Sequence, residues 1–325
     1  MRVSVVITSY NQKDYLTQAI DSVLAQTVAP YEIIICDDYS SDGSRDLIRQ
    51  YSKTYKRRVR AIFHERNLGV TRNRNSGLKS ARGDYITTLD GDDLYLPEKL
   101  DKEMRKAKDS NAPLVYSNIL YINEEGQETG IRYKNNRQLE GCLFEEIATL
   151  KYPAPREVLI KRSCIEELGY QDESLEINED FEWIARLSSR YPFATVKEPL
   201  AKHRFHPNGL HQSGRLLLLE TLAKVTEKMV IYCEKSIVRN KLQTRKAISA
   251  FSHLSRARIE MHQANPSQAI RSVQRSISQD WLRSSSYDLY MRLVMPKLFK
   301  RQHRIADQLM LGPLPIPFYL LRGLF

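Results

Sequence analysis

Apolar and polar positions alternate along the first two hundred residues in a pattern that predicts short buried strands separated by helices. Val3–Thr8 is a nearly continuous apolar run, which is typical of a strand buried on both faces of a sheet. After it, apolar side chains from Tyr15 to Leu24 recur at the spacing of one helix face. Similar runs predict further strands at Glu32–Cys36, Val59–His64, Tyr85–Leu89, Leu114–Ile122 and Glu157–Lys161. Strands that alternate with helices predict an α/β fold, with a mostly parallel sheet flanked by helices.

Polar residues indicate where several of these helices begin. Asn11, with Asp14 three residues later, resembles a helix cap followed by an acidic residue in the first turn. The Ser and Asp residues of SSDGS provide caps for a helix from about Arg45. Another helix is expected over Leu100–Lys108.

The pattern changes in the last third of the chain. From Arg215 onward the strand signals nearly vanish, and long stretches carry helical periodicity. Two of these stretches flank the sequence QANPSQ, which predicts a helix–turn–helix hairpin. We therefore expect a domain boundary near residue 214, followed by a smaller all-α region.

The composition is that of a globular protein with 325 residues, of which 42% are hydrophobic. Its four cysteines are scattered without paired metal-ligand spacing, which predicts a reducing compartment and no disulfides. The N-terminal sequence MRVSVVITSY is too short and too polar after Thr8 for a signal peptide. No run of about 18 apolar residues is present, so the sequence predicts a cytoplasmic protein without a membrane-spanning helix.

The net charge of +11 is concentrated after residue 214, where 19 Lys and Arg face 7 Asp and Glu, against 31 and 32 before it. In residues 295–325, basic side chains adjoin large apolar ones. This combination favours a segment that lies on an anionic membrane surface, and hence peripheral attachment to the inner face of the cytoplasmic membrane. Two alternatives stay open: a merely soluble basic helical region, or an apolar tail that folds back onto its own domain.

Three carboxylates follow the predicted strand Tyr85–Leu89, at Asp90, Asp92 and Asp93. Like charges this close raise one another's pKa, so a positive partner is expected among them. Mn²⁺ or Mg²⁺ would suit these oxygen ligands, and Gly91 would let the backbone come close. A lone Asp-x-Asp is ordinarily a solvated turn, but open α/β sheets bind ligands at the carboxyl ends of their strands. The position therefore favours a metal site.

The order of five segments resembles the family-2-like inverting glycosyltransferases of the GT-A fold. The segments are VVITSYNQKDYLTQAIDSVLAQT, IIICDDYSSDGS, NLGVTRNRNSGLKSARGDYITTLDGDD, EDFEW and HRFHPNGLHQS. The resemblance implies a catalytic, nucleotide-sugar-binding GT-A domain over residues 1–214, followed by a basic helical region over 215–325. It also implies metal-dependent transfer of one sugar, with inversion, from a nucleotide diphosphate sugar to a sugar or lipid-linked acceptor. The setting would be bacterial surface polysaccharide or glycolipid assembly. The Gln-x-x-Arg-Trp signature of processive synthases is absent from the sequence, which predicts one sugar per encounter.

The resemblance assigns the nucleoside to the ends of the first two strands. Thr8 and Tyr10 follow the first strand and Asp38 follows the second, so they match the family's base-binding rim. Tyr10 would stack on a pyrimidine while Asp38 accepts a hydrogen bond from its N–H edge, which makes a UDP-sugar the expected donor. In the alternative interpretation, Asp37 or Asp38 simply caps the following helix.

The resemblance assigns roles near the metal and the diphosphate to Asp92, Asp90 and Arg74. Asp92 is implied as the direct metal ligand, with Asp90 nearer the ribose or reached through water. Arg74 falls on a cation that neutralises the diphosphate, although Arg72 leaves the register open, and a solvated surface arginine is the alternative.

Near residue 204, a second motif matches a segment that closes over the diphosphate in the family. Arg204 and His206 are the matching residues. His206 would bind the metal or donate to the leaving phosphate. A loop histidine without either role is the alternative.

Inverting transfer also needs a base that takes the proton of the acceptor hydroxyl. Glu179 and Asp180 start a predicted helix whose apolar stripe contains Trp183, Ile184 and Leu187. By the resemblance, Asp180 is the base. Plain helix capping is the alternative interpretation.

Other classes of protein explain less of the sequence. A catalytically inactive nucleotide-sugar-binding protein is the main alternative. A nucleotidyltransferase would normally have a Gly-rich phosphate loop, which TSYNQKDY lacks. A nucleic-acid binder would explain the basic tail but leave the acidic cluster unexplained, so no nucleic-acid partner is expected.

Overall fold

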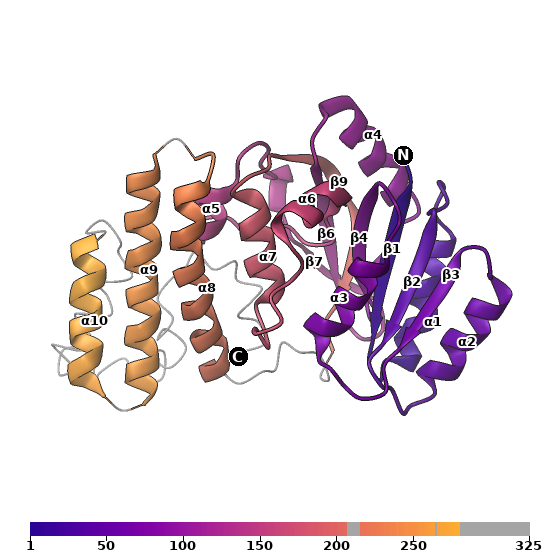
Figure 1. Cartoon of the computed structure of the whole chain (residues 1–325), viewed down its shortest axis with the longest axis horizontal. Coiled ribbons are helices and arrows are strands. Elements are labelled where there is room, and N and C mark those ends of the chain that lie inside the picture. The colour runs from indigo at the N-terminus through magenta and orange to yellow at the C-terminus, as the bar shows by residue number, and fades with distance from the viewer. Residues whose placement is uncertain (207–214, 239, 264, 280–325) are drawn as a thin grey trace. The chain divides into compact units, whose positions relative to one another are not determined.

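The computed structural model describes residues 1–206, 215–238, 240–263 and 265–279 (Figure 1). The chain divides into two compact units. The first consists of Met1–Cys142, Pro155–Trp183 and Tyr191–Pro207, and the second of Leu143–Ala154, Ile184–Arg190 and the chain from Asn208 onward. The predicted boundary near residue 214 and the basic segment 295–325 lie outside the described residues.

Within the described residues of the first unit, nine strands form one sheet (Figure 1). Their order is β3-β2-β1-β4-β8-β6-β9-β5, and β7 pairs with β6. The pairs of β1 with β2, β2 with β3, β1 with β4 and β6 with β9 are parallel, whereas β8 runs antiparallel to β4 and β6. The strands are β1 (Val3–Ser9), β2 (Glu32–Asp37), β3 (Val59–Phe63), β4 (Tyr85–Asp90), β5 (Leu94–Tyr95), β6 (Leu114–Ile122), β7 (Glu128–Ile131), β8 (Leu159–Lys161) and β9 (Phe193–Arg204).

Helices cover both faces of the β1–β4 part of this sheet because β1 is apolar on both of its faces. Val5 and Ile7 share one buried cluster with the apolar stripe of α1. Val6 points to the opposite face, where a Cβ on Gly77 of α3 would lie only 2.3 Å from Val6 Cγ1. The helices with residues in this unit are α1 (Lys13–Leu24), α2 (Ser44–Thr54), α3 (Val70–Ser80), α4 (Lys99–Ser110), the 3₁₀ helix Lys134–Asn136, α6 (Arg162–Leu168) and α7 (Glu179–Ser188).

The strand order creates a topological switch point between β1 and β4. The chain first extends outward from β1 through β2 to β3, and then returns to place β4 on the other side of β1. Thr8 of β1 and Asp90 of β4 are register partners at the carboxyl ends of these strands. Open α/β sheets bind their ligands in the crevice at such a point.

The second unit is helical in its described residues, as the sequence predicted for the last third of the chain. Its helices are α5 (Phe144–Ala148), α8 (Arg215–Lys235), α9 (Lys241–His262) and α10 (Pro266–Gln279) (Figure 1). α9 packs against α10 through Leu254, Ala257 and Val273, and Ser276 Oγ donates to Ala250 O at 2.6 Å. The hairpin predicted around QANPSQ is confirmed. In the part of the chain that the structure describes, no helix is both long and apolar enough to cross a bilayer.

Two local predictions are wrong. Asn11 is not a helix cap, because α1 follows Gln12 and Asn11 has a left-handed φ of 51°. Its Oδ1 instead accepts from Ser41 N at 2.9 Å, which joins the loop after β1 to the loop after β2. The last predicted strand begins at Leu159 rather than Glu157, because a φ of 45° at Glu157 is incompatible with a strand.

Several elements were not predicted from the sequence, and α3 and β9 are two of them. α3 has a polar sequence, VTRNRNSGLKS, yet it buries Asn73, Arg74 and Asn75. β9 contains Pro199, which lies at an irregularity in its pairing with β6. Both sequences depart from the simple apolar periodicity by which helices and strands are recognised.

Candidate active site

Asp90 ends β4 at the switch point, where two side chains hold one of its oxygens. Thr8 Oγ1 donates to Asp90 Oδ1 at 2.9 Å, and Arg74 Nη2 from α3 donates to the same oxygen at 2.6 Å. Burial disfavours the charged form, but Arg74, and after it Arg156, outweigh this effect and hold the pKa of Asp90 well below its ordinary 3.8. Asp90 therefore stays ionised in the folded protein.

Arg74 connects Asp90 to the segment that leads into α7. Its Nη1 donates to Glu179 Oε1 at 3.0 Å and to Gln171 Oε1 at 3.2 Å, and the residue is 6% exposed. Arg72, the alternative in the ambiguous register, is half-exposed and pairs with Glu173 at 3.4 Å. Of these two arginines, Arg74 is the one that lies beside the acidic cluster.

Asp92 and His206 meet at the rim of the acidic cluster. Asp92 Oδ2 and His206 Nε2 are 2.8 Å apart, and this hydrogen bond to Asp92 raises the pKa of His206. A carboxylate and an imidazole are both ligand groups for divalent cations, and a bound ion would take the place of this hydrogen bond. A Cβ on Gly91 would lie 2.8 Å from Thr8 O, so the packing against β1 requires glycine at this position.

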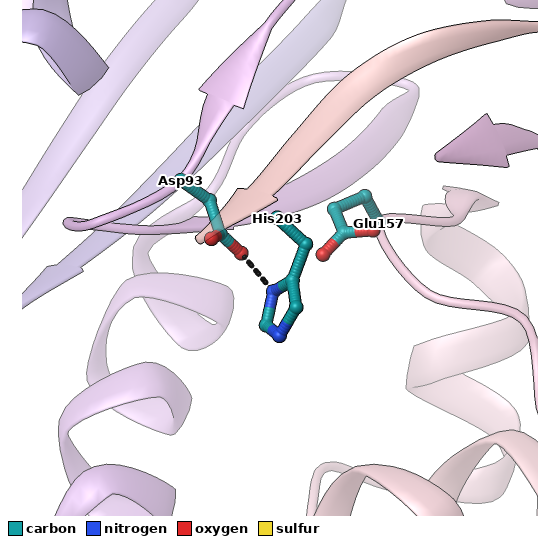
Figure 2. A group of neighbouring side chains, drawn as sticks. All are labelled: Asp93, Glu157 and His203. Atoms are coloured by element: carbon teal, nitrogen blue, oxygen red, sulfur yellow. Dashed lines mark hydrogen bonds and ion pairs between the residues drawn. The ribbon is translucent and has the colours of Figure 1, made fainter. Parts of the chain in front are cut away.

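A second group of ligand-type side chains lies close by, consisting of Asp93, Glu157 and His203 (Figure 2). One ligand atom from each lies within 4.8 Å of the others, and all three side chains are buried. His203 Nδ1 and Asp93 Oδ2 are 2.8 Å apart. Burial raises the pKa of Asp93 well above its ordinary value and lowers that of His203 to about 4. We therefore expect this pair to hold one proton between its two side chains.

Each nitrogen of the Arg204 guanidinium donates a hydrogen bond to an acceptor of the protein. Its Nε donates to Asp92 O at 3.0 Å, Nη1 to Glu124 O at 2.7 Å and Nη2 to Gln18 Oε1 at 3.0 Å. The residue is 2% exposed and its guanidinium lies over the ring of Tyr15. In this arrangement Arg204 fixes the backbone of Asp92, and direct contact with a diphosphate stays a prediction.

The predicted base-binding rim brings together the loops after β1 and β2. Asp38 N donates to Ser9 O at 2.9 Å, and Tyr10, the next residue, is 47% exposed. Asp38 is buried, and its carboxylate accepts from Leu68 N at 2.7 Å and Gly69 N at 2.8 Å. These bonds hold the loop before α3, and a carboxylate has further acceptor sites that they leave unused.

Asp180 lies in the first turn of α7 and is accessible. Its side chain is 47% exposed, its Oδ1 accepts from Phe181 N at 2.7 Å, and its Oδ2 is 3.7 Å from Arg156 Nη1. Three residues later, Trp183 is buried and donates from Nε1 to Gly169 O at 3.0 Å, which fixes the start of the helix. This arrangement presents a carboxylate on a firmly held helix end.

The comparisons identify the family to which the chain belongs. Residues 4–169 match the family described as Glycosyl transferase family 2. The chain belongs to this family. It is therefore a glycosyltransferase by family, as the resemblance of its sequence implied.

Curated relatives agree with this assignment. The chain is 32% identical over 213 residues to an uncharacterised glycosyltransferase of Methanocaldococcus jannaschii, over 63% of this chain and 71% of that protein. It is 35% identical over 124 residues to the putative teichuronic acid biosynthesis glycosyltransferase TuaG of Bacillus subtilis, over 38% of this chain. It is also 35% identical over 121 residues to WfgD of Escherichia coli, over 37% of this chain, and it spans about half of TuaG (49%) and of WfgD (47%).

Solved structures support the fold. The crystal structure of S. aureus TarS 1–349 in complex with UDP-GlcNAc matches this structure with a TM-score of 0.70 at 18% sequence identity. The match covers 93% of this chain and 92% of that chain. The mannosyltransferase PcManGT from Pyrobaculum calidifontis, in complex with GDP-Man and Mn²⁺, has a TM-score of 0.55 at 16% identity, over 99% and 86% of the two chains. At such identities the likeness concerns the fold alone, and it confirms the predicted GT-A architecture.

Several side chains of the candidate site were not predicted from the sequence. Arg156 is one, although it lies near both Asp90 and Asp180. Nothing in PREV distinguishes this arginine from a surface residue, because its partners come 66 positions earlier and 24 positions later. Asp93 was predicted only as a member of the acidic cluster in DGDD, and its pairing with His203 requires the three-dimensional structure.

Glu179 provides a testable pH dependence. Burial, and then the charge of Asp180, raise the pKa of Glu179 to about 7 against the opposing effect of Arg74. Because this value exceeds the ordinary 4.5, folding takes up a proton between these two pH values. The stabilisation is complete below the unfolded-state pKa and is lost as the pH rises through the folded-state pKa, with a full effect of about 3 kcal/mol.

We expect Glu179→Gln to remove this pH-dependent contribution to the stability, since an amide does not titrate. The melting temperature of the variant should rise relative to the wild type between pH 5 and pH 8, as measured by thermal melts across that range. Glu166→Gln is the control, because Glu166 is exposed on α6 and pairs with Arg162. A difference between Glu179→Gln and the wild type that stays constant with pH would contradict the proton uptake.

Proposed function

We propose that this chain is a metal-dependent inverting glycosyltransferase that moves one sugar from a nucleotide diphosphate sugar to an acceptor hydroxyl. The proposal is carried by one observation. Arg74 and Arg156 connect Asp90, at the end of β4, to Glu179 and Asp180, at the start of α7. Asp90, the carboxylate proposed to lie near the donor, and Asp180, the carboxylate proposed as the base, therefore belong to one network at the switch point of the sheet.

Asp92 and His206 are the residues that would hold the metal. Their donor set suits Mn²⁺ or Mg²⁺, and the imidazole favours Mn²⁺ because Mg²⁺ prefers oxygen ligands. The Mn²⁺ bound to PcManGT supports this choice. A bound cation would neutralise and orient the two donor phosphates. Arg204 would keep the Asp92 backbone in place through its bond to Asp92 O.

The donor that fits the rim is a UDP-sugar. Tyr10 is exposed for stacking, Asp38 retains acceptor capacity, and Thr8 holds Asp90 near the expected ribose. TarS was crystallised with UDP-GlcNAc, and the name of WfgD gives a UDP-Glc donor and a diphosphoundecaprenol acceptor. By analogy, we assign the chain to polysaccharide or glycolipid assembly with a sugar or lipid-linked acceptor. Peripheral attachment of residues 295–325 to an anionic membrane belongs to the same proposal.

Asp180 is the general base of the proposed reaction. Its carboxylate takes the proton of the acceptor hydroxyl as that oxygen bonds to the anomeric carbon. The bond from this carbon to the diphosphate oxygen breaks on the opposite face, and the electron pair leaves with the diphosphate. Attack opposite the leaving group inverts the configuration. The exposure of Asp180 allows an acceptor to approach it.

A thermal-shift screen of UDP-glucose, UDP-GlcNAc and GDP-mannose, each with and without Mn²⁺, tests the proposal. A ligand at 100 times its Kd stabilises the folded state by about 2.7 kcal/mol, which corresponds to a shift of a few degrees. We expect a UDP-sugar to produce this shift only in the presence of Mn²⁺. The absence of a shift with every nucleotide sugar would contradict the function, and equal shifts without Mn²⁺ would contradict metal dependence.

A further inference from the structure

The guanidinium of Arg156 lies among three carboxylates of the first unit. Its Nη1 is 3.7 Å from Asp180 Oδ2, its Nη2 is 3.6 Å from Asp90 Oδ2, and its Nε is 3.4 Å from Glu157 Oε1. The side chain is 21% exposed. One planar group therefore faces both the carboxylate at the end of β4 and the carboxylate in the first turn of α7.

Arg74 and Arg156 both face Asp90, but they are held differently. Arg74 makes contacts of 2.6 Å with Asp90 and 3.0 Å with Glu179, in or near the range of charge-assisted hydrogen bonds. All three contacts of Arg156 are longer than the about 2.7–2.9 Å of such bonds. Arg74 is therefore held by short hydrogen bonds, whereas Arg156 attracts and orients its carboxylates chiefly through its positive charge.

The backbone beside Arg156 is fixed in a rare conformation. Glu157 has a left-handed φ of 45°, which a non-glycine residue keeps only where its surroundings enforce it. Its carbonyl oxygen accepts from the buried Lys99 Nζ at 2.9 Å and from Thr87 Oγ1 at 3.3 Å. Core residues thus specify the place from which Arg156 extends, and strained residues of this kind cluster at functional sites.

Asp180 needs a partner that fixes its direction. It is half-exposed at a helix end, and Phe181 N–H occupies only its Oδ1. A carboxylate in this position has several staggered rotamers available. Arg156 faces the other oxygen, Oδ2, and at the same time faces Asp90. In the rotamer observed, Asp180 Oδ2 faces the same guanidinium that faces Asp90.

We propose that Arg156 is a positioning residue that holds the Asp180 carboxylate toward the donor. The inference rests on the proposed function, in which Asp180 is the base. Arg156 directs the oxygen that receives the acceptor proton, because its Nη1 lies 3.7 Å from Asp180 Oδ2 while its Nη2 faces Asp90. A planar guanidinium faces two carboxylates at once, which the compact ammonium of lysine does less well.

The test compares Arg156→Gln and Arg156→Lys with the control Arg105→Gln, which changes an exposed arginine paired with Asp101 on α4. Catalysis is measured as the rate of UDP release from UDP-glucose or UDP-GlcNAc with Mn²⁺, a reaction in which water replaces the acceptor hydroxyl. Binding of UDP with Mn²⁺ is measured by calorimetry. We expect Arg156→Gln to lower kcat about 10–100-fold while the Kd for UDP changes less than about threefold. Arg156→Lys should recover part of the rate.

The same variants in an Asp180→Asn background separate positioning from a general structural role. There, Arg156→Gln should change the rate less than about threefold, because the carboxylate that it positions is already absent. An equal loss in both backgrounds, or a wild-type kcat in Arg156→Gln, overturns the positioning role. Failure of the proposed function gives a different result, in which the wild-type chain neither binds UDP with Mn²⁺ nor releases it from a nucleotide sugar.

Discussion

Asp180→Asn is expected to lower the rate of sugar transfer about 10²-fold or more, as the loss of a general base does. The amide keeps the size of the side chain and can still accept from Phe181 N–H, so the start of α7 should persist. Binding of UDP with Mn²⁺ should stay within about threefold of the wild type, since the base acts on the acceptor. Initial rates and calorimetry on the same preparation measure the two effects.

Glu176→Gln is the matched control for this variant. Glu176 is an exposed acid four residues before Asp180, so its replacement changes the local charge equally without touching the network. Its rate should equal that of the wild type. If Asp180→Asn retains full turnover, the base is a different group, with Glu179 the nearest candidate.

Asp92→Ala is expected to abolish the metal-dependent part of nucleotide binding. Loss of the carboxylate removes one proposed ligand and also the partner that orients His206. Even groups behind metal ligands typically contribute 10–100-fold to metal affinity, so the affinity for UDP with Mn²⁺ should fall about 10²-fold or more. Calorimetry with UDP should give the same Kd with and without Mn²⁺. Asp46→Ala, at an exposed ion pair with Arg49 on α2, should leave both values unchanged.

The buried group of Asp93, Glu157 and His203 offers the competing location for a cation. If Asp92→Ala binds UDP and Mn²⁺ normally while Glu157→Gln does not, the ion occupies that group instead. The structure gives a reason to expect the first outcome. Asp93 already accepts from Arg204 N at 2.8 Å and contacts His203, and Glu157 contacts Arg156. A dication there would have to displace these partners and approach a guanidinium.

The sequence predicted β1, β2 and β4 well because these strands are largely buried on both faces. Apolar runs define β1 and β4 almost to the residue, and chemistry follows directly after each run, at Thr8 and Asp90. α3 was missed for the opposite reason. Its buried residues include Asn73, Arg74 and Asn75, which serve neighbouring loops and carboxylates instead of an apolar core. Because these buried positions of α3 are polar, its sequence lacks the apolar periodicity that predicts a helix.

Contacts between distant segments set the other limit of sequence interpretation. The ambiguity between Arg72 and Arg74 disappears once the helix packs on the sheet, because only one of the two can reach Asp90. Arg156 carries no local signal, since its neighbours are brought to it by β8 and α7. Arg204 matches its motif, but the fold surrounds its guanidinium with backbone carbonyls, which no local pattern could have indicated.

The long sequence separations within this site have a consequence for synthesis on the ribosome. Glu179 joins Arg74 across 105 positions, and His203 and His206 reach Asp93 and Asp92 across 110 and 114 positions. At the usual 5–20 residues per second, translation of such an interval takes roughly 5–20 s. Throughout that time the nascent chain carries its acidic cluster without the later partners. The site is therefore incomplete until β9 emerges and pairs with β6.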